Sequence, residues 1–288
     1  MEQVGFFKRL ERKLRWKRTE IKKISISTQN IFDLTISYQA NQTQLLSANP
    51  LNRFGRKCFS QSDEDGITLE ILKRIDGLSS GVFAEFGVGD GMENNSLILK
   101  AMKWKGYWVG GEELKPKIEN PTDRCFAYLR AWVTRQNIIE LARNGLKSID
   151  EAQADVISLD FDGNDMYFVE DLLVAGFNPK LFIVEYNAKF PPPIEFCIEY
   201  NAEHTWTQDD YFGASLASYE KLFRRFNYKL VCCNSHTGCN AFFVREEYSD
   251  KFTDIPSEID KIYMPPRYLV PREYGHQKSV RTIEKLFK

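Results

Sequence analysis

The sequence lacks the features that mark secreted and membrane-spanning proteins. It has only six cysteines in 288 residues, and no two of them form a CxxC pair. This argues against a zinc site or a disulfide framework and favours a reducing compartment. No apolar run approaches the roughly 18 residues of a transmembrane helix, and the N-terminus has neither the apolar core nor the cleavage site of a secretory signal. We therefore expect a cytoplasmic protein, or one bound at the inner face of the membrane.

Net charge is also small. A formal charge of −1 at pH 7 provides no general attraction for nucleic acid. The chain has no Asn/Asp-Pro-Pro-Tyr motif for a flipped base, so we expect no nucleic-acid partner. Residues 1–23 are the exception, with nine Lys and Arg against three Glu.

Apolar residues recur in this basic segment at helical spacing, namely Phe7, Leu10, Leu14, Ile21 and Ile24. A basic amphipathic helix of this kind either contacts an anionic membrane surface or packs on its own domain or in a homodimer. The sequence leaves these alternatives open.

What the sequence does contain is an alternation of apolar strand patterns and amphipathic helix patterns. We expect strands at 82–86, 106–110, 126–134, 154–162 and 181–187. The helices expected around them are 60–75, 96–102, 135–145, 164–175 and 213–226. Gly145 is expected to end the third of these helices.

The last two expected strands, 228–233 and 240–246, decide the type of sheet. Only the six residues NSHTGC separate them, whereas a parallel crossover needs about a dozen. They must therefore form an antiparallel hairpin. The sequence predicts an α/β fold with a Rossmann-like, seven-stranded, mostly parallel sheet that ends in an antiparallel hairpin.

This pattern divides the chain into three regions. We expect an N-terminal basic helix and linker at 1–54, the α/β domain at 55–248, and a Pro-rich C-terminal arm with a helix at 249–288.

The stretch VFAEFGVGDGMENNS, residues 82–96, leads from the first strand into a glycine turn. Together with the final hairpin, its acidic-x-Gly-x-Gly-x-Gly pattern resembles the signature of class I S-adenosylmethionine-dependent methyltransferases. A dinucleotide fingerprint would need a third glycine where Met92 stands, so an NAD or nucleotide-sugar enzyme is the less favoured alternative.

Further motifs resemble the FkbM-type methyltransferases of polysaccharide and sugar modification. They are SQSDEDG, RAWVTRQNI, VISLDFDGND, VEYNA, YFGASLASYEKL and NAFFVR, and the resemblance covers roughly residues 55–245. It implies an O-methyltransferase that uses S-adenosylmethionine and acts on a sugar hydroxyl in glycan biosynthesis. A non-catalytic scaffold or sensor in a membrane-associated glycan-assembly complex is the alternative.

The resemblance also implies a set of cofactor-binding residues. Glu85 would lie near the amino group of the cofactor, and an acid after the second strand, Glu112 or Glu113, would hold the ribose hydroxyls unless both are simply solvated. The implied set is Gln61, Ser62, Glu85, Gly87, Gly89, Asp90, Gly91, Asn95, Glu112 and Asp160.

Carboxylates occur at two neighbouring strand ends. Asp160 and Asp162 are two residues apart and would share one face of a strand, as would Glu185 and Asn187. Open α/β sheets bind ligands at this edge, and an all-oxygen set suits Mg²⁺. The sequence therefore predicts a magnesium site made by these four residues. The competing interpretation is that Asp162 and Asp165 cap the next helix.

Candidates for removing the acceptor proton are Asp160, Asp162 and His204. His204 falls in a long irregular stretch, 188–210, whose aromatic residues, together with Tyr211 just after it, suit sugar faces; they are Phe196, Tyr200, Trp206 and Tyr211. His236 is expected to be solvated in the hairpin turn, and His276 lies in the C-terminal arm.

Overall fold

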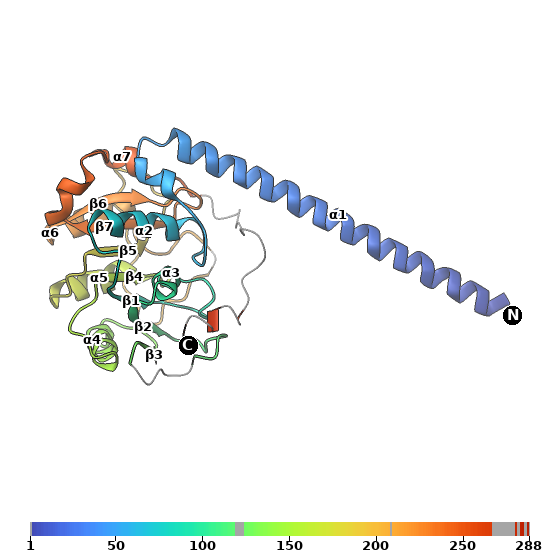
Figure 1. Cartoon of the computed structure of the whole chain (residues 1–288), viewed down its shortest axis with the longest axis horizontal. Helices are drawn as coiled ribbons and strands as arrows, with labels where there is room; N and C mark the ends of the chain where they lie inside the picture. The colour runs from blue at the N-terminus through green and yellow to red at the C-terminus, as the bar shows by residue number, and fades with distance from the viewer. Residues whose placement is uncertain are drawn as a thin grey trace. The chain divides into compact units, whose positions relative to one another are not determined.

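The structure is a computed structural model that describes residues 2–118, 124–207 and 209–266, and residues 280, 283, 284 and 287. Side chains of helix α1 are described from Arg15 onward, except at positions 32, 33 and 36. The chain divides into a helical unit, Met1–Gln42, and a globular unit, Thr43–Lys288 (Figure 1). His276 lies outside the described residues.

The division falls earlier than the expected boundary after residue 54. The 3₁₀ helix η1 (Pro50–Phe54) belongs to the globular unit, where Leu51 is fully buried. Two side-chain amides hold the segment to strand β6, because Asn49 donates to the Val231 carbonyl (2.7 Å) and Asn52 to the Cys233 carbonyl (2.8 Å). This segment is therefore part of the globular unit and not a linker.

The globular unit is built on a seven-stranded sheet in the order β3-β2-β1-β4-β5-β7-β6. The strands are β1 (Val82–Phe86), β2 (Lys105–Gly110), β3 (Phe126–Arg130), β4 (Val156–Leu159), β5 (Leu181–Glu185), β6 (Tyr228–Cys233) and β7 (Asn240–Arg245). Strands β1 to β5 pair in parallel, and β7 runs antiparallel to both β5 and β6. The predicted α/β fold with its antiparallel end is confirmed.

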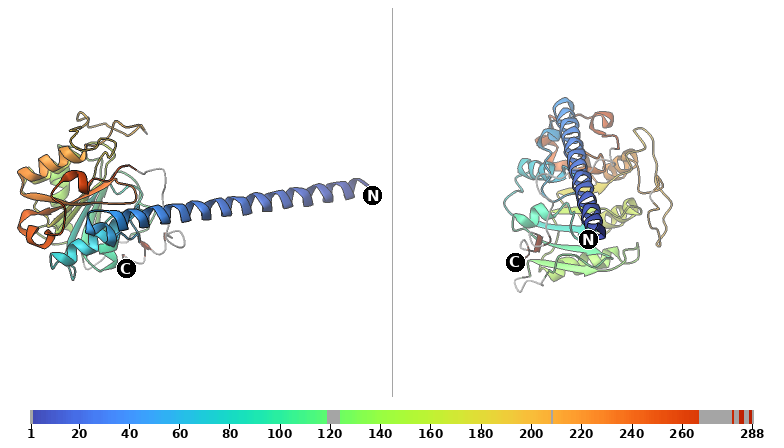
Figure 2. Two further views of the ribbon diagram at one scale, coloured as in Figure 1. Left: turned by 90° about the horizontal axis from the view of Figure 1, so that it is seen from above. Right: turned by 90° about the vertical axis from the view of Figure 1, so that its right-hand side faces the viewer.

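Helices cover both faces of this sheet, with α4, α5 and α6 on one side and α2 and α3 on the other (Figures 1 and 2). Their bounds are α2 (Glu64–Arg74), α3 (Leu97–Ala101), α4 (Ile138–Ser148), α5 (Asp165–Val174), α6 (Leu216–Arg225) and α7 (Ile259–Ile262), with a second 3₁₀ helix η2 (Glu246–Phe252). Because both faces are covered, every residue of the central strands β1 and β4 is buried.

Gly145 does not end α4, contrary to the expectation from sequence. The helix continues to Ser148. A β-carbon at position 145 would collide with the ring of Tyr107 on β2. The glycine therefore lets the helix lie close to the sheet, which is a packing role that local sequence signals do not reveal.

Helix α1 (Glu2–Leu46) is much longer than the basic segment 1–23 that suggested it. Its last turn, from Thr43, belongs to the globular unit. Within the described part of the chain, no helix is both long enough and apolar enough to cross a membrane.

Candidate functional site

The glycine turn after β1 has the backbone that the sequence predicted. Gly87 has φ +82°, and a β-carbon there would collide with the Asp160 carbonyl, so only glycine allows the ends of β1 and β4 to approach. Gly89 has φ +51° and no atom lies within 4 Å of where its β-carbon would be. The turn thus offers open space beside its backbone. Gly91 closes the turn with φ +80°, close to Leu114.

Glu85 holds the turn and does not face the open space. Its carboxylate accepts hydrogen bonds from the backbone N–H of Asn95 (2.8 Å) and from the N–H (3.0 Å) and hydroxyl of Ser96. Burial raises the pKa of Glu85 to about 7. Asn95 donates to Ser158 Oγ on β4 (3.1 Å). Both residues therefore fasten the start of α3 to the sheet, and neither has a contact that marks it as a direct ligand.

Asp90 connects the turn to the segment after β2. One oxygen accepts from the Met92 N–H (3.0 Å), and the other forms an ion pair with Lys115 Nζ (2.6 Å). The hydrogen bond with Asp90 raises the pKa of Lys115, and the charge of Glu112 adds to this effect. Of the two acids proposed for the ribose, Glu112 is thus the one whose charge acts on Lys115.

Ser62 lies in a buried polar network rather than at an open surface. Its hydroxyl contacts Glu64 Oε1 (3.0 Å) and accepts from Asn234 Nδ2 (2.8 Å). Gln61 is exposed, and its side-chain oxygen accepts from the Cys239 thiol (3.4 Å). The network joins the acids before α2 to the β6–β7 hairpin through Ser62, Asp63, Glu64, Asn234, Ser235, Thr237 and Asn240.

The same network overturns the expectation that His236 is solvated. The residue is only 7% exposed, and its backbone N–H donates to Asp63 Oδ1 (3.1 Å). The hairpin turn is buried because its backbone N–H groups satisfy an acid from another part of the chain. The sequence contained one signal for this burial, namely a run of three acids at 63–65 and a hairpin turn rich in polar residues that could bind them.

Three carboxylates meet at the carboxyl ends of β4 and β5. One oxygen each of Asp160, Asp162 and Glu185 lies within 4.8 Å of the others. Strand β4 ends at Leu159, and the chain then turns through Asp162, which has φ +53°. Glu185 is the last residue of β5. The turn, and not the alternation of a longer strand, brings the two aspartates together.

The surroundings of these carboxylates are electrostatically unbalanced. Among the described residues, no Lys, Arg or His forms a salt bridge with any of the three. Burial and then repulsion by neighbouring acids raise the pKa of Asp160 and of Glu185 well above the usual range. The Glu185 Oε2 atom is buried without a hydrogen-bond partner among the described groups.

This arrangement fits a divalent cation. Oxygen donors at short separation, none of them in a salt bridge with a described basic side chain, are what Mg²⁺ takes in proteins. The orphaned oxygen of Glu185 is the kind of atom that an ion would satisfy. Asp160, Asp162 and Glu185 are therefore the residues that could hold a metal.

Asn187, the fourth predicted ligand, forms hydrogen bonds with the loop after β5. Its Nδ2 donates to the carbonyls of Asp210 and Phe212 (both 3.0 Å), and its Oδ1 accepts from the Lys189 N–H (3.2 Å). Because β5 ends at Glu185, the two-residue alternation that placed Asn187 beside Glu185 does not extend to it. The amide anchors the loop that follows β5.

Asp165 and Asp162 differ in their hydrogen bonds. Asp165 accepts from the backbone N–H groups of Phe161 (2.8 Å) and Gly163 (3.0 Å), so it shapes the turn before α5. Neither aspartate caps α5, because the N-cap position is Asn164 and Asp165 is the first residue of the helix. Asp162 is exposed and has no side-chain hydrogen bond to a described residue.

The loop after β5 brings His204 to this site. Its ring packs on Gly163, where a β-carbon would collide with it, and its Nε2 is buried without a hydrogen-bond partner in the described chain. Although Asp162 is exposed, the surrounding protein partly desolvates its carboxyl group and raises its pKa, and the charge of His204 opposes this rise. Asn164 anchors the loop by donating to the Asn201 carbonyl (2.7 Å).

The aromatic residues of this loop divide into anchors and exposed rings. The Tyr200 hydroxyl accepts from the Arg135 N–H (3.0 Å), and Phe196 stacks on Phe190. Trp206 and Tyr211 remain 45% and 47% exposed. The Trp206 N–H donates to the Asp209 carbonyl (2.7 Å), so this side chain presents its ring face rather than its donor.

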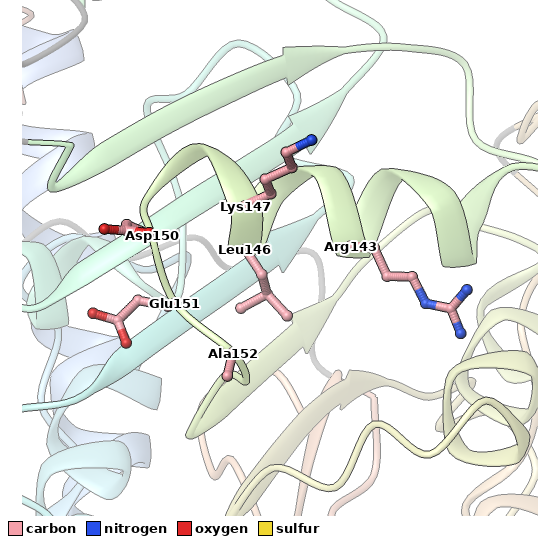
Figure 3. A pocket seen from close by; sticks show the side chains of 6 residues that line it. All are labelled: Arg143, Leu146, Lys147, Asp150, Glu151 and Ala152. Atoms are coloured by element: carbon pink, nitrogen blue, oxygen red, sulfur yellow. The ribbon is translucent and has the colours of Figure 1, made fainter.

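One open pocket lies elsewhere. It has a volume of about 460 Å³ and is lined by Arg143, Leu146, Lys147, Asp150, Glu151 and Ala152 (Figure 3). These residues precede β4, whereas Asp160 follows it. The pocket is therefore at the opposite edge of the sheet from the carboxylates, and none of the predicted site residues lines it.

No known protein family and no curated protein matches the sequence. Among solved structures, an O-methyltransferase family 2 protein from Planctomyces limnophilus in complex with apigenin is similar, at 13% identity over 75% of this chain and 61% of that one, with a TM-score of 0.34. YjhP from E. coli is 12% identical over 57% and 66%, with a TM-score of 0.30.

The MycE methyltransferase of the mycinamycin biosynthetic pathway, in complex with Mg and SAH, is 12% identical over 74% of this chain and 57% of that one, with a TM-score of 0.33. The chain spans less than two thirds of the length of each of these proteins. Since all three scores lie below 0.5, the function of this chain is inferred from its own strand order and site geometry.

Proposed function

We propose that the globular unit transfers a methyl group from S-adenosylmethionine to a hydroxyl oxygen. The sheet has the strand arrangement expected from the class I methyltransferase resemblance. The observation that carries the proposal is the meeting, at one edge of this sheet, of the glycine turn and the three carboxylates. Gly87 and the Asp160 backbone are in direct contact there, so a ligand on the turn lies beside the acids.

In this proposal the cofactor lies against the turn at Gly89, where the structure has open space. Glu112 accepts hydrogen bonds from the ribose hydroxyls, because a carboxylate can accept from both. Glu85 and Asn95 act indirectly by holding the turn and α3 in place.

Asp160, Asp162 and Glu185 would hold the divalent ion. When bound, such an ion polarises an acceptor hydroxyl and lowers its pKa. The protein residues then orient that hydroxyl for in-line attack. The C–O bond forms as the C–S bond breaks, and S-adenosylhomocysteine leaves as a neutral thioether.

We assign the hydroxyl proton to His204 Nε2, which has no other hydrogen-bond partner in the described chain. His204 and the Asp162 carboxylate are close enough to interact electrostatically. The proton therefore stays beside the site until product leaves.

The acceptor that we propose is a sugar or glycan hydroxyl. The exposed ring faces of Trp206 and Tyr211 follow His204 in the same loop. Aromatic rings of this kind provide a large apolar surface with little conformational entropy to lose, and the C–H face of a sugar ring is a suitable partner.

The test is a calorimetric titration of S-adenosylhomocysteine into the full chain, with and without Mg²⁺, followed by turnover with sugar acceptors. We expect micromolar binding and a dependence of turnover on Mg²⁺. No binding in either arm would rule the proposal out. Binding without methyl transfer to any acceptor would instead favour a non-catalytic, cofactor-sensing scaffold.

A further inference from the structure

Helix α1 carries a seven-residue repeat that the proposed function does not use. From Ile21 onward, two positions of each heptad form one stripe, which we call the seam. Its members are Ile21, Ile24, Thr28, Ile31, Thr35, Tyr38, Gln42 and Leu45. The spacing alternates strictly between three and four residues, and Phe7, Leu10 and Leu14 extend the same pattern toward the N-terminus of the sequence.

A strict seven-residue repeat has a specific physical meaning. A straight α-helix has 3.6 residues per turn, so a stripe of period 3.5 drifts around it unless the helix supercoils about another helix. Ile21, Ile24, Ile31, Tyr38 and Leu45 are each 65–67% exposed. A periodic pattern that runs from residue 7 to residue 45 is typical of a coiled coil and not of a helix that packs on one domain.

At the end of α1 the seam is exposed except at Gln42, which is half-buried. Gln44 is buried and donates to the Gly55 carbonyl (3.1 Å), which ties the last turn to the globular unit. Leu45, the next residue and the last of the seam, stays exposed. Gln44 and Leu45 therefore face different sides of the helix.

Charge decides the orientation of a partner. Residues 15–23 contain five Lys and Arg and one Glu, whereas residues 34–46 contain no charged residue. A parallel pair in register would place Lys17, which continues the seam toward the N-terminus, against the same lysine of a second copy, and such like-charge contacts are unfavourable. An antiparallel pair places the basic half of one helix against the uncharged half of the other.

We infer that α1 pairs with α1 of a second copy of this chain, antiparallel and through the seam. The register that sets Thr28 opposite Ile31 of the second copy also sets Ile21 opposite Tyr38, and Lys17 opposite Gln42. Each polar or small position then faces an apolar or uncharged one. Burying eight seam positions from each helix removes on the order of 1,200 Å² from water, which reaches the range of stable interfaces. The inference does not depend on the proposed function.

The first test is the mass of the full chain in solution, measured by light scattering after size exclusion. We expect twice the 33.5 kDa of one chain. The double variant Ile24→Glu with Ile31→Glu should have the single-chain mass. Ile26→Glu is the matched control, because Ile26 is half exposed on the same helix but outside the seam, and it should leave the doubled mass unchanged.

A single-chain mass for the unmodified protein would overturn the inference, and so would a doubled mass that survives in the seam variant. Thermal unfolding of each variant shows that the globular unit remains folded. If the unmodified chain is monomeric and instead co-sediments with vesicles containing phosphatidylserine, the seam serves a membrane surface and the pairing is wrong.

Cross-linking tests the orientation. Lys17→Cys and Gln42→Cys chains are prepared with Cys58→Ser, because Cys58 is the exposed native cysteine of the described residues. Oxidation of the two chains mixed should give cross-linked dimers, whereas either chain alone should give few. Efficient cross-linking of Lys17→Cys chains to one another would show a parallel pair and overturn the antiparallel register.

Discussion

Two groups of three acids lie in the globular unit, and they differ in what surrounds them. Asp63, Glu64 and Asp65 are fully buried, yet each accepts hydrogen bonds from donors of the chain. Asp65 alone accepts from the N–H groups of Cys58 (2.7 Å), Phe59 (2.6 Å) and Ser60 (3.0 Å). These acids hold the start of α2 to the loop before it and to the β6–β7 hairpin.

The second group, Asp160, Asp162 and Glu185, is less buried but has no such donors, and its members repel one another. Burial of an acid is therefore a poor guide to function in this protein. The presence or absence of donors separates an acid that stabilises the fold from one that is available for a ligand.

We expect the largest effect on stability from a substitution in the first group, whose acids accept hydrogen bonds from the chain. Asp65→Ala leaves the N–H groups of Cys58, Phe59 and Ser60 without their acceptor, so we expect the free energy of unfolding to fall by about 3 kcal/mol. Urea unfolding measures this. Asp250→Ala is the control, since this side chain is exposed and its ion pair with Lys251 is long at 3.8 Å; it should change stability little. Equal effects of the two variants would contradict the comparison.

Asp162→Asn, in the second group, should reduce turnover without reducing stability. Removing one charge from a group of acids relieves repulsion, so stability should stay the same or rise. Turnover should fall about 100-fold, or about 2.7 kcal/mol, because the ligand loses its negative charge, which is also the charge beside His204. Steady-state kinetics and urea unfolding on the same preparation check both parts. Full turnover with unchanged cofactor affinity would remove Asp162 from the site.

Glu112→Gln extends the comparison to the acids after β2. We expect the dissociation constant for S-adenosylhomocysteine to rise about tenfold, or about 1.4 kcal/mol, because the ribose hydroxyls lose their charged acceptor. Glu113→Gln is the neighbouring control and should leave the constant unchanged. Calorimetry on both variants decides between the two acids, and a larger effect at Glu113 would reverse the assignment.

The pH dependence of stability follows from two acids that lie outside the group of Asp160, Asp162 and Glu185. The pKa of Asp65 is raised from 3.8 to about 6 and that of Glu85 from 4.5 to about 7. Between about pH 4 and 7 the folded chain thus holds protons that the unfolded chain has released. The free energy of unfolding should therefore decrease as pH rises through this window.

The smallest expected effect is that of Mg²⁺ on stability. At millimolar concentration it should raise the free energy of unfolding by about 1 kcal/mol at pH 7.5, and by less at pH 5, where protons compete for Asp160, Asp162 and Glu185. Thermal unfolding with and without Mg²⁺ measures this difference, and Glu185→Gln should abolish it. Stabilisation that persists in Glu185→Gln would place the ion elsewhere.

Much of the fold could be predicted because its signals are local. The six residues between Cys233 and Asn240 allow only a hairpin, and the apolar runs of β1 and β5 begin where the sequence indicated. Strand ends were less predictable. The runs at 154–162 and 181–187 continue past the last paired residues, since a ladder ends where its partner strand ends.

The residue types of the candidate site could be predicted from the sequence. Which of these residues bind other parts of the chain, and which remain available for a ligand, could not. Glu85, Ser62, Asn187 and Asp165 look in the sequence like the polar residues that remain available for a ligand. They differ only in which distant N–H, hydroxyl or carbonyl groups reach them. No local pattern records such contacts.

The amino-acid sequence by itself determined four features: the hairpin at the end of the sheet, the glycine turn after β1, the positions of the acids at the carboxyl edge and the seven-residue repeat of α1. Each of these depends on spacing along the chain. Only the tertiary structure decided which acids meet donors and which meet one another. It also decided that His204 packs on Gly163 and that Gly145 lies inside a helix, because these outcomes depend on segments that are far apart in sequence and are brought into contact by the sheet.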